Sequence, residues 1–137
     1  MDSFQAELLL AMHGCRESKQ ALSEILDFSH SLIRDEVLEQ EIERKTLCGM
    51  SPEEIRQASH FPQDFYGIPH FMPSGEDSME ILLLNKARCA AREAELAGVQ
   101  AFSDRDGKIT RPDLIKALNR MSSMLYILMI KRKAGKE

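Results

Sequence analysis

The 137-residue sequence has no tryptophan and only three cysteines. Cys15, Cys48 and Cys89 lie far apart, and no two of them have the close spacing of a metal knuckle. An odd number of cysteines argues against a disulfide framework. Reduced thiols in a cytoplasmic protein are therefore the simplest interpretation.

Long apolar runs and a surplus of positive charge are also missing. No apolar run approaches the ~20 residues that a helix needs to cross a bilayer, and no basic segment followed by a long apolar stretch opens the chain. The net charge is -4, whereas nucleic-acid-binding proteins usually carry a basic face. We expect a cytoplasmic protein with no membrane and no nucleic-acid partner. One dense basic cluster, interpreted as a solvated C-terminal tail, consists of Lys131, Arg132, Lys133 and Lys136.

No segment alternates apolar and polar residues over the length of a strand, and apolar residues recur instead at helical spacing. The sequence therefore predicts an all-α fold, an antiparallel bundle of about five helices that forms one domain over residues 1–137. Ser51-Pro52-Glu53-Glu54 has the composition of a capping box with proline at the first helical position. The expected helices cover residues 4–13, 16–33, 35–47 (ended by Gly49), 51–59 and 77–102, followed by a last helix capped by Thr110.

Residues 60–73 contain three prolines and a glycine, which forbid a continuous helix. The same segment holds several aromatic residues and two histidines, which linkers usually lack. We expect this loop to fold back onto the edge of the core or onto a ligand. His60 and His70 could act together there, because a loop can bring them close, although each is more often a packing residue.

Two polar stripes lie on the predicted C-terminal helices. On the first, Asn85, Arg88, Arg92 and Glu95 follow one another at steps of three and four, so they share one helix face. If the helices pair, these side chains meet and favour a polyphosphate ligand, since guanidinium groups match phosphate oxygens. The alternative is a solvated face with an Arg92–Glu95 pair. The last helix carries a second polar stripe of Asn119, Ser122 and Tyr126, and the alternative for Asn119 and Ser122 is that they are ordinary interhelical polar residues. The first helix also carries small residues that allow close helix approach, namely Ala87, Ala90, Ala94, Ala97 and Ala101.

The segments 84–95 (LNKARCAAREAE) and 118–126 (LNRMSSMLY) resemble motifs of the ATP:cob(I)alamin adenosyltransferases. The first is similar to that family's R-x-x-x-R-x-x-E helix, and the second to its L-N-R-L-S motif. The likeness covers about residues 48–130 and is strongest for the ethanolamine-utilisation branch. The residues shared with that branch are Cys48-Gly49-Met50-Ser51, His60, Pro62, His70, Pro73 and Arg111-Pro112-Asp113-Leu114.

The resemblance implies transfer of the 5′-deoxyadenosyl group from ATP to cob(I)alamin, with ATP, Mg²⁺ and cobalamin as ligands. By carry-over, Arg88 and Arg92 neutralise the triphosphate, and Glu95 orients an arginine or helps to hold Mg²⁺. Asn119 contacts the nucleotide, with Asn85 and Ser122 beside it on the two stripes. The corrinoid lies near the loop that holds His60, Phe65, Tyr66, His70 and Phe71, where an aromatic residue excludes the lower axial ligand. The family also implies a homo-oligomer, expected to be a trimer, with the site between subunits.

Other interpretations remain open at this point. The chain carries neither the T-K-x-G-D-x-G segment of the propanediol-utilisation branch nor an upstream metal motif rich in histidine and cysteine. It could be a non-catalytic module that binds a corrinoid or a nucleotide, or a helical interaction protein with an acidic partner. Residues 104–109 imitate the middle of an EF-hand, but Phe102 then falls at the first ligand position and Asp113 at the twelfth, so a polar turn is favoured over a calcium site.

Overall fold

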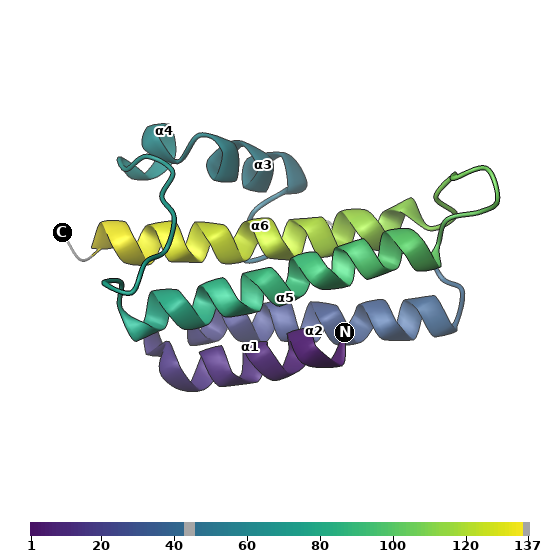
Figure 1. Cartoon of the computed structure of the whole chain (residues 1–137), viewed down its shortest axis with the longest axis horizontal. Helices are drawn as coiled ribbons and strands as arrows, with labels where there is room; N and C mark the ends of the chain where they lie inside the picture. The colour runs from purple at the N-terminus through teal and green to yellow at the C-terminus, as the bar shows by residue number, and fades with distance from the viewer. Residues whose placement is uncertain (43–45, 136–137) are drawn as a thin grey trace.

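The computed structural model describes residues 1–42 and 46–135, which form six α-helices, a 3₁₀ turn and no strand (Figure 1). The predicted all-α fold is therefore confirmed. Two isolated β-bridges, Leu47–Met50 and Ser103–Ile109, close turns. In chain order the elements are α1 (Asp2–Gly14), η1 (Arg16–Ser18), α2 (Lys19–Val37), α3 (Pro52–His60), α4 (Pro62–Tyr66), α5 (Met79–Ala101) and α6 (Pro112–Gly135).

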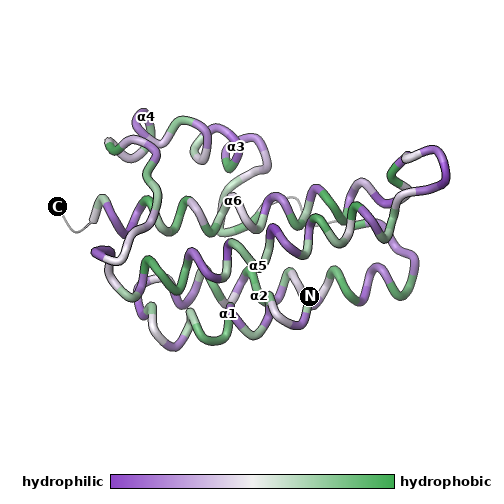
Figure 2. The backbone as a smooth tube through the Cα atoms, viewed as in Figure 1, coloured by the Kyte–Doolittle hydropathy of each residue, from purple (hydrophilic) through white to green (hydrophobic). Residues whose placement is uncertain are grey.

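Helices α1, α2, α5 and α6 run along the long axis of the molecule, and the short α3 and α4 lie outside α6 (Figure 1). The most extensive contact joins α5 to α6, and α1 packs against both α5 and α2. Burial of apolar side chains between these helices supplies the main driving force for folding. The turn between α5 and α6 is mostly hydrophilic (Figure 2). The largest fully buried side chains include Phe4, Phe28, Leu84, Met121 and Met124.

Small residues let α5 approach α6 closely. Ala87 and Ala91 are fully buried, and a Cβ at Gly98 would lie 2.8 Å from Cδ1 of Ile115 on α6. The predicted alanine stripe is only partly right, because Ala97 and Ala101 at its C-terminal end are exposed. The buried small face instead runs through Ala87, Ala91 and Gly98.

The N-terminal signal of α3 is confirmed. The Ser51 hydroxyl accepts from the Glu54 N–H at 3.2 Å, and the Glu54 carboxylate accepts from the Ser51 N–H at 2.9 Å. The following segment is not wholly irregular, because Pro62 begins the five-residue helix α4. A proline needs no helical hydrogen-bond acceptor at that position, which makes this start compatible with the sequence. Gly67, with φ of 77°, ends the helix.

The prediction of separate helices at 16–33 and 35–47 is wrong. Helix α2 continues to Val37 and ends in a left-handed turn at Glu39, whose φ is 55°. The Gln40 N–H donates to the Asp35 carbonyl, and the Glu39 N–H donates to the Glu36 carbonyl, which together form a Schellman motif. Glycine usually occupies that left-handed position, so a glutamate there does not predict the end of a helix. Residues 43–45 of the predicted second helix lie outside the described residues.

Two further predictions at the ends of α6 are corrected. Thr110 does not cap the helix, because its hydroxyl donates to the Phe102 carbonyl at 2.9 Å and α6 begins at Pro112. Arg132 and Lys133 do not lie in a solvated tail. They belong to α6, where Arg132 pairs with Glu17 and Glu80, and Lys133 pairs with Asp77. Lys136 lies outside the described residues.

In the part of the chain that the structure describes, no helix is both long and apolar enough to cross a membrane.

Candidate functional site

A pocket of about 420 Å³ lies between α3, α5 and α6. Its polar walls come from the two predicted stripes, which the α5–α6 pairing brings together as expected, except that Asn85 does not line the pocket. The end of α3 closes one side. The lining residues are Ser59, His60, Arg88, Arg92, Glu95, Leu96, Val99, Asn119, Ser122, Ser123 and Tyr126.

Arg88 and Arg92 are one helical turn apart on α5 and supply the positive charge of this pocket. The Arg88 Nε donates to Oδ1 of Asn85 at 3.2 Å, and the Arg88 guanidinium carbon lies 5.7 Å from the centre of the Tyr126 ring. Arg92 is exposed, and its side chain makes no hydrogen bond or ion pair with any residue in the described ranges. It is therefore available to an anionic ligand.

Glu95 is engaged by α6 rather than by its neighbour on α5. The Asn119 Nδ2 donates to Oε2 of Glu95 at 3.2 Å. The alternative Arg92–Glu95 pair does not form among the described side chains. Ser122 is buried and its hydroxyl donates to the Asn119 carbonyl at 2.9 Å, so it supports α6 locally.

His70 links the Tyr126 side chain to the backbone of His60. The His70 Nδ1 lies 2.9 Å from the Tyr126 hydroxyl, and the His70 Nε2 lies 2.9 Å from the His60 carbonyl oxygen. The Phe71 N–H also donates to the Tyr126 hydroxyl, at 3.3 Å. His70 and Phe71 both stack beside the Tyr126 ring. The loop therefore folds back onto α6, as its aromatic composition indicated.

The other predicted aromatic residues lie away from this pocket. Phe65 is exposed on α4, and Tyr66 beside it is half-buried against the core, where burial raises the pKa of its phenol. Neither lines the 420 Å³ pocket, whereas His60 does. Phe71 packs against Tyr126, and the centre of its ring lies 4.9 Å from Nζ of Lys133.

A second pocket of about 400 Å³ adjoins the first on the side of α3. The two share His60, Glu95, Asn119 and Ser123, so they form one continuous groove. Its three cations were not predicted as site residues. Arg56 lies on a different helix, Lys116 precedes the second motif, and Arg120 lies within that motif but was given no role. Partial burial lowers the pKa of the Arg120 guanidinium. The groove is thus basic at both ends in a protein of net charge -4.

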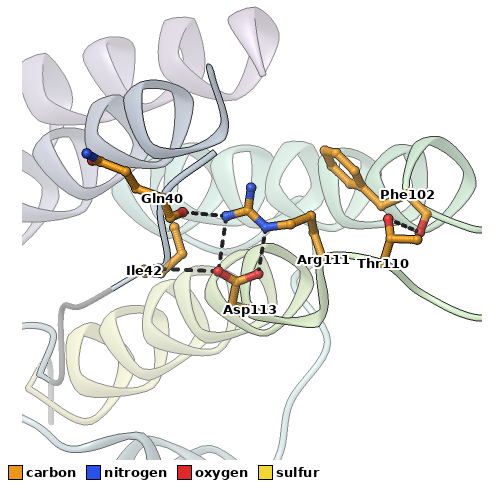
Figure 3. Close-up of polar contacts among 6 residues, drawn as sticks. All are labelled: Gln40, Ile42, Phe102, Thr110, Arg111 and Asp113. Atoms are coloured by element: carbon orange, nitrogen blue, oxygen red, sulfur yellow. Dashed lines mark hydrogen bonds and ion pairs between the residues drawn. The ribbon is translucent and has the colours of Figure 1, made fainter. Parts of the chain in front are cut away.

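Another cavity, of about 690 Å³, lies elsewhere and does not suit a polyphosphate. Its arginine, Arg111, is already bound by Asp113, with Nε to Oδ1 and Nη2 to Oδ2 both at 3.1 Å (Figure 3). The cavity otherwise carries mainly carboxylates, from Glu36, Glu39 and Glu41.

The Arg111–Asp113 pair fastens the residues after α2 to the start of α6. The Arg111 Nη2 donates to the Gln40 carbonyl at 2.7 Å, and the Ile42 N–H donates to the Asp113 carboxylate at 3.2 Å (Figure 3). The guanidinium lowers the pKa of Asp113 below its usual value. This geometry gives the Arg111-Pro112-Asp113 motif a structural role.

The turn after α5 is the polar turn that the sequence favoured. Asp104 Oδ1 accepts the backbone N–H groups of Asp106 and Lys108, at 2.9 and 2.8 Å. Gly107 takes the left-handed conformation, with φ of 78°. Within residues 1–42 and 46–135, no group of three or more His, Cys, Asp or Glu residues could hold a metal ion.

Comparison with known proteins gives consistent matches. The family model for cobalamin adenosyltransferase matches residues 1–132, which extends the likeness beyond the expected 48–130 to the first helices. The corrinoid adenosyltransferase EutT of Salmonella typhimurium (strain LT2) is 30% identical over 100 residues, which are 73% of this chain and 38% of that protein. EutT of Escherichia coli (strain K12) is 31% identical over 109 residues, which are 80% of this chain and 41% of that protein. The chain thus spans about two fifths of the length of these curated relatives. No solved structure matches.

Proposed function

The chain belongs to the cobalamin adenosyltransferase family, and from this membership we propose that it transfers the 5′-deoxyadenosyl group of ATP to cob(I)alamin and releases triphosphate. The observation that carries the proposal is the convergence of both motif helices on one pocket. Arg88, Arg92 and Glu95 enter it from α5, and Asn119 enters it from α6.

In the proposed reaction the electron pair of Co(I) attacks the 5′-carbon of the ATP ribose. That pair forms the cobalt–carbon bond, the carbon–oxygen bond to the triphosphate breaks, and the triphosphate leaves with the electron pair of the broken bond. The protein contributes positioning and stabilisation of the charge that develops on the leaving group. Arg92, which has no competing partner among the described residues, would bind the triphosphate together with Arg88.

Asn119 would hydrogen-bond the nucleotide, with Asn85 and Ser122 holding the neighbouring groups in place. The Asn119 amide already donates one hydrogen bond to Glu95 and keeps its second N–H and its oxygen for a ligand. Mg²⁺ would arrive with the triphosphate, since Mg²⁺ is commonly held by one or two carboxylates and substrate phosphates. Glu95 is the one carboxylate that lines the 420 Å³ pocket, so we assign it as the nearest protein ligand or orienting group.

The corrinoid would lie on the side of the pocket formed by residues 60–73. His60 lines the pocket, while His70 and Phe71 contact Tyr126 at its edge. Exposed Phe65, with Tyr66 beside it, offers aromatic surface on α4 for excluding the lower axial ligand of the corrinoid.

We further propose that the protein acts in the cytoplasm as a homo-oligomer, a trimer with active sites between subunits. The exposed alanines of α5, Ala97 and Ala101, and nearby exposed Leu96 support close packing of a second subunit near the pocket.

The test is to incubate the protein with ATP, Mg²⁺ and chemically reduced cobalamin and to follow the corrinoid spectrum for a light-sensitive product. Formation of adenosylcobalamin and triphosphate in equal amounts is expected. Absence of product with ATP or cobalamin still bound would replace this proposal with a non-catalytic binding module. Binding of neither ligand would leave the helical interaction protein as the interpretation.

A further inference from the structure

Tyr126 joins two parts of the molecule that the proposed reaction needs together. Its ring lies against the Arg88 guanidinium, with 5.7 Å between the guanidinium carbon and the ring centre. Its hydroxyl lies within hydrogen-bond distance of His70 and Phe71 in the loop after α4. One half-buried side chain of α6 therefore contacts both the triphosphate-binding helix and the aromatic loop.

The hydrogen bonds around this phenol have one consistent direction when His70 is neutral. The His60 carbonyl can only accept, so the His70 Nε2 carries the proton and donates to it. The His70 Nδ1 then accepts from the Tyr126 O–H, and the phenol oxygen accepts from the Phe71 N–H. This tautomer is assigned from the network. Every donor in the set finds an acceptor, which fixes the loop to the end of α3 and to α6.

Arg88 is held from two sides. Asn85, one turn earlier on α5, accepts from the Arg88 Nε at 3.2 Å, and the Tyr126 ring lies beside the guanidinium. A cation placed over an aromatic face is attracted by the ring's electron density. Among residues 1–42 and 46–135, the two terminal nitrogens of Arg88 have no hydrogen-bond or ion-pair partner, and Arg88 lines the pocket.

We propose that Tyr126 is a positioning residue. Its ring holds Arg88 toward the pocket, and its hydroxyl holds residues 70 and 71 against α6, so that the nucleotide side and the corrinoid side of the site are aligned before substrates bind. The identity of those substrates rests on the proposed function, whereas the coupling itself is a property of this chain's side chains.

The coupling can be read without any substrate. The ring current of Tyr126 should shift the Arg88 Hε resonance in a proton–nitrogen NMR spectrum, with the signal assigned by its loss in Arg88→Lys. The shift should persist in Tyr126→Phe, which keeps the ring, and disappear in Tyr126→Leu. If Tyr126→Leu does not fold, the Arg88 Hε shift is measured in Tyr126→Met instead. An Arg88 signal that is unchanged in the folded aliphatic variant would overturn the proposal.

The hydroxyl half of the proposal is tested in the same samples. Tyr126→Phe removes the acceptor of the Phe71 N–H, so exchange of the Phe71 amide hydrogen should accelerate about tenfold, the factor that one ordinary hydrogen bond supplies. The amide of Ala117, buried in α6, serves as the internal control. An unchanged Phe71 exchange rate would show that other contacts hold the loop. It would overturn the proposal that the Tyr126 hydroxyl holds residues 70 and 71 against α6.

Steady-state kinetics test whether Tyr126 also affects the proposed reaction. Tyr126→Leu should raise the KM for ATP about two- to fivefold, as expected from the loss of an exposed cation–π contact. In an Arg88→Ala background the same change should raise it no further, because the ring acts through Arg88. If Tyr126→Leu and Arg88→Ala raise the KM for ATP additively, the ring does not act through Arg88 and that part of the proposal is overturned. If the parent protein transfers no adenosyl group, the proposed function fails while the NMR and exchange measurements still decide the positioning role.

Discussion

The Nδ2 of Asn119 on α6 lies 3.2 Å from Oε2 of Glu95 on α5 and donates a hydrogen bond to it. This contact links the two family motifs directly. It also takes Glu95 away from Arg92, the partner that spacing on α5 alone would favour. Arg92 is left without a hydrogen-bond or ion-pair partner among the described residues, and the Glu95 carboxylate is held by α6.

Glu95 variants should separate positioning from charge. Glu95→Gln keeps an oxygen that can accept from Asn119, so adenosyl transfer should stay within about tenfold of the parent. Glu95→Ala removes the acceptor and should cost a further tenfold or more, the usual effect of losing a hydrogen bond to a charged group. Steady-state kinetics over a Mg²⁺ titration measure both. Equal losses in the two variants, with a raised Mg²⁺ requirement, would assign Glu95 to the metal instead.

Arg92→Ala should lower turnover at least about 100-fold, because in the proposed reaction it removes a positive charge that would stabilise the leaving triphosphate. Its thermal melting should not change, since the Arg92 side chain makes no ion pair within the described residues. Arg105→Ala is the matched control, because Arg105 is an exposed arginine in the α5–α6 turn that does not line the pocket. Turnover that survives Arg92→Ala would contradict the assignment of the triphosphate site.

Asp113 should make folding sensitive to acid. Arg111 depresses the pKa of Asp113 in the folded state, so the stabilisation is present above the unfolded carboxyl pKa and is lost as the pH falls through the folded value. Asp113→Asn should therefore cost about 1–2 kcal/mol at neutral pH, and this difference should narrow toward pH 3. Urea unfolding at several pH values measures it. Asp106→Asn, at an exposed position, is the control, and an equal pH-independent loss in both would contradict the pair's role.

Gly98 should tolerate a β-branched side chain poorly. A Cβ there would lie 2.8 Å from Cδ1 of Ile115 and 3.7 Å from Cδ1 of Leu118, so Gly98→Val would force these side chains to repack. We expect it to lose about 1–3 kcal/mol more than Gln100→Val, which places the same β-branched residue at an exposed position of the same helix. Chemical denaturation compares the two. Equal stability of both variants would mean that Ile115 moves aside at no cost.

The thiols of Cys15 and Cys89 should react with a thiol reagent at very different rates. Cys15 is buried, and burial, with Glu80 nearby, raises its pKa to about 11, so almost no thiolate is present at pH 8. Cys89 is exposed and should react first with a thiol reagent. Cys89→Ser should remove the fast phase, and Cys15 should react only after unfolding. Fast labelling of Cys15 in the native protein, mapped by mass spectrometry, would show that α1 opens readily.

The start of α3 and the polar stripes of the candidate site could be predicted from local sequence patterns. The capping box of Ser51 and Glu54 depends on residues three apart, and it forms as predicted. The stripes of α5 and α6 depend only on the helical period, and their short connection brought them together. The end of α2 at Val37 was missed, because the left-handed residue that follows it is Glu39 rather than the glycine that usually marks such an end.

The sequence by itself determined most of the helices, the two polar stripes and the family motifs, because each depends on neighbours within a turn or two. Only the tertiary structure decided which polar groups pair. Asn119 reaches Glu95, Tyr126 lies beside Arg88, and Arg56 on α3 enters the adjoining pocket. These choices follow from the rotation and packing of whole helices, which are set by side-chain fit across the core rather than by local spacing.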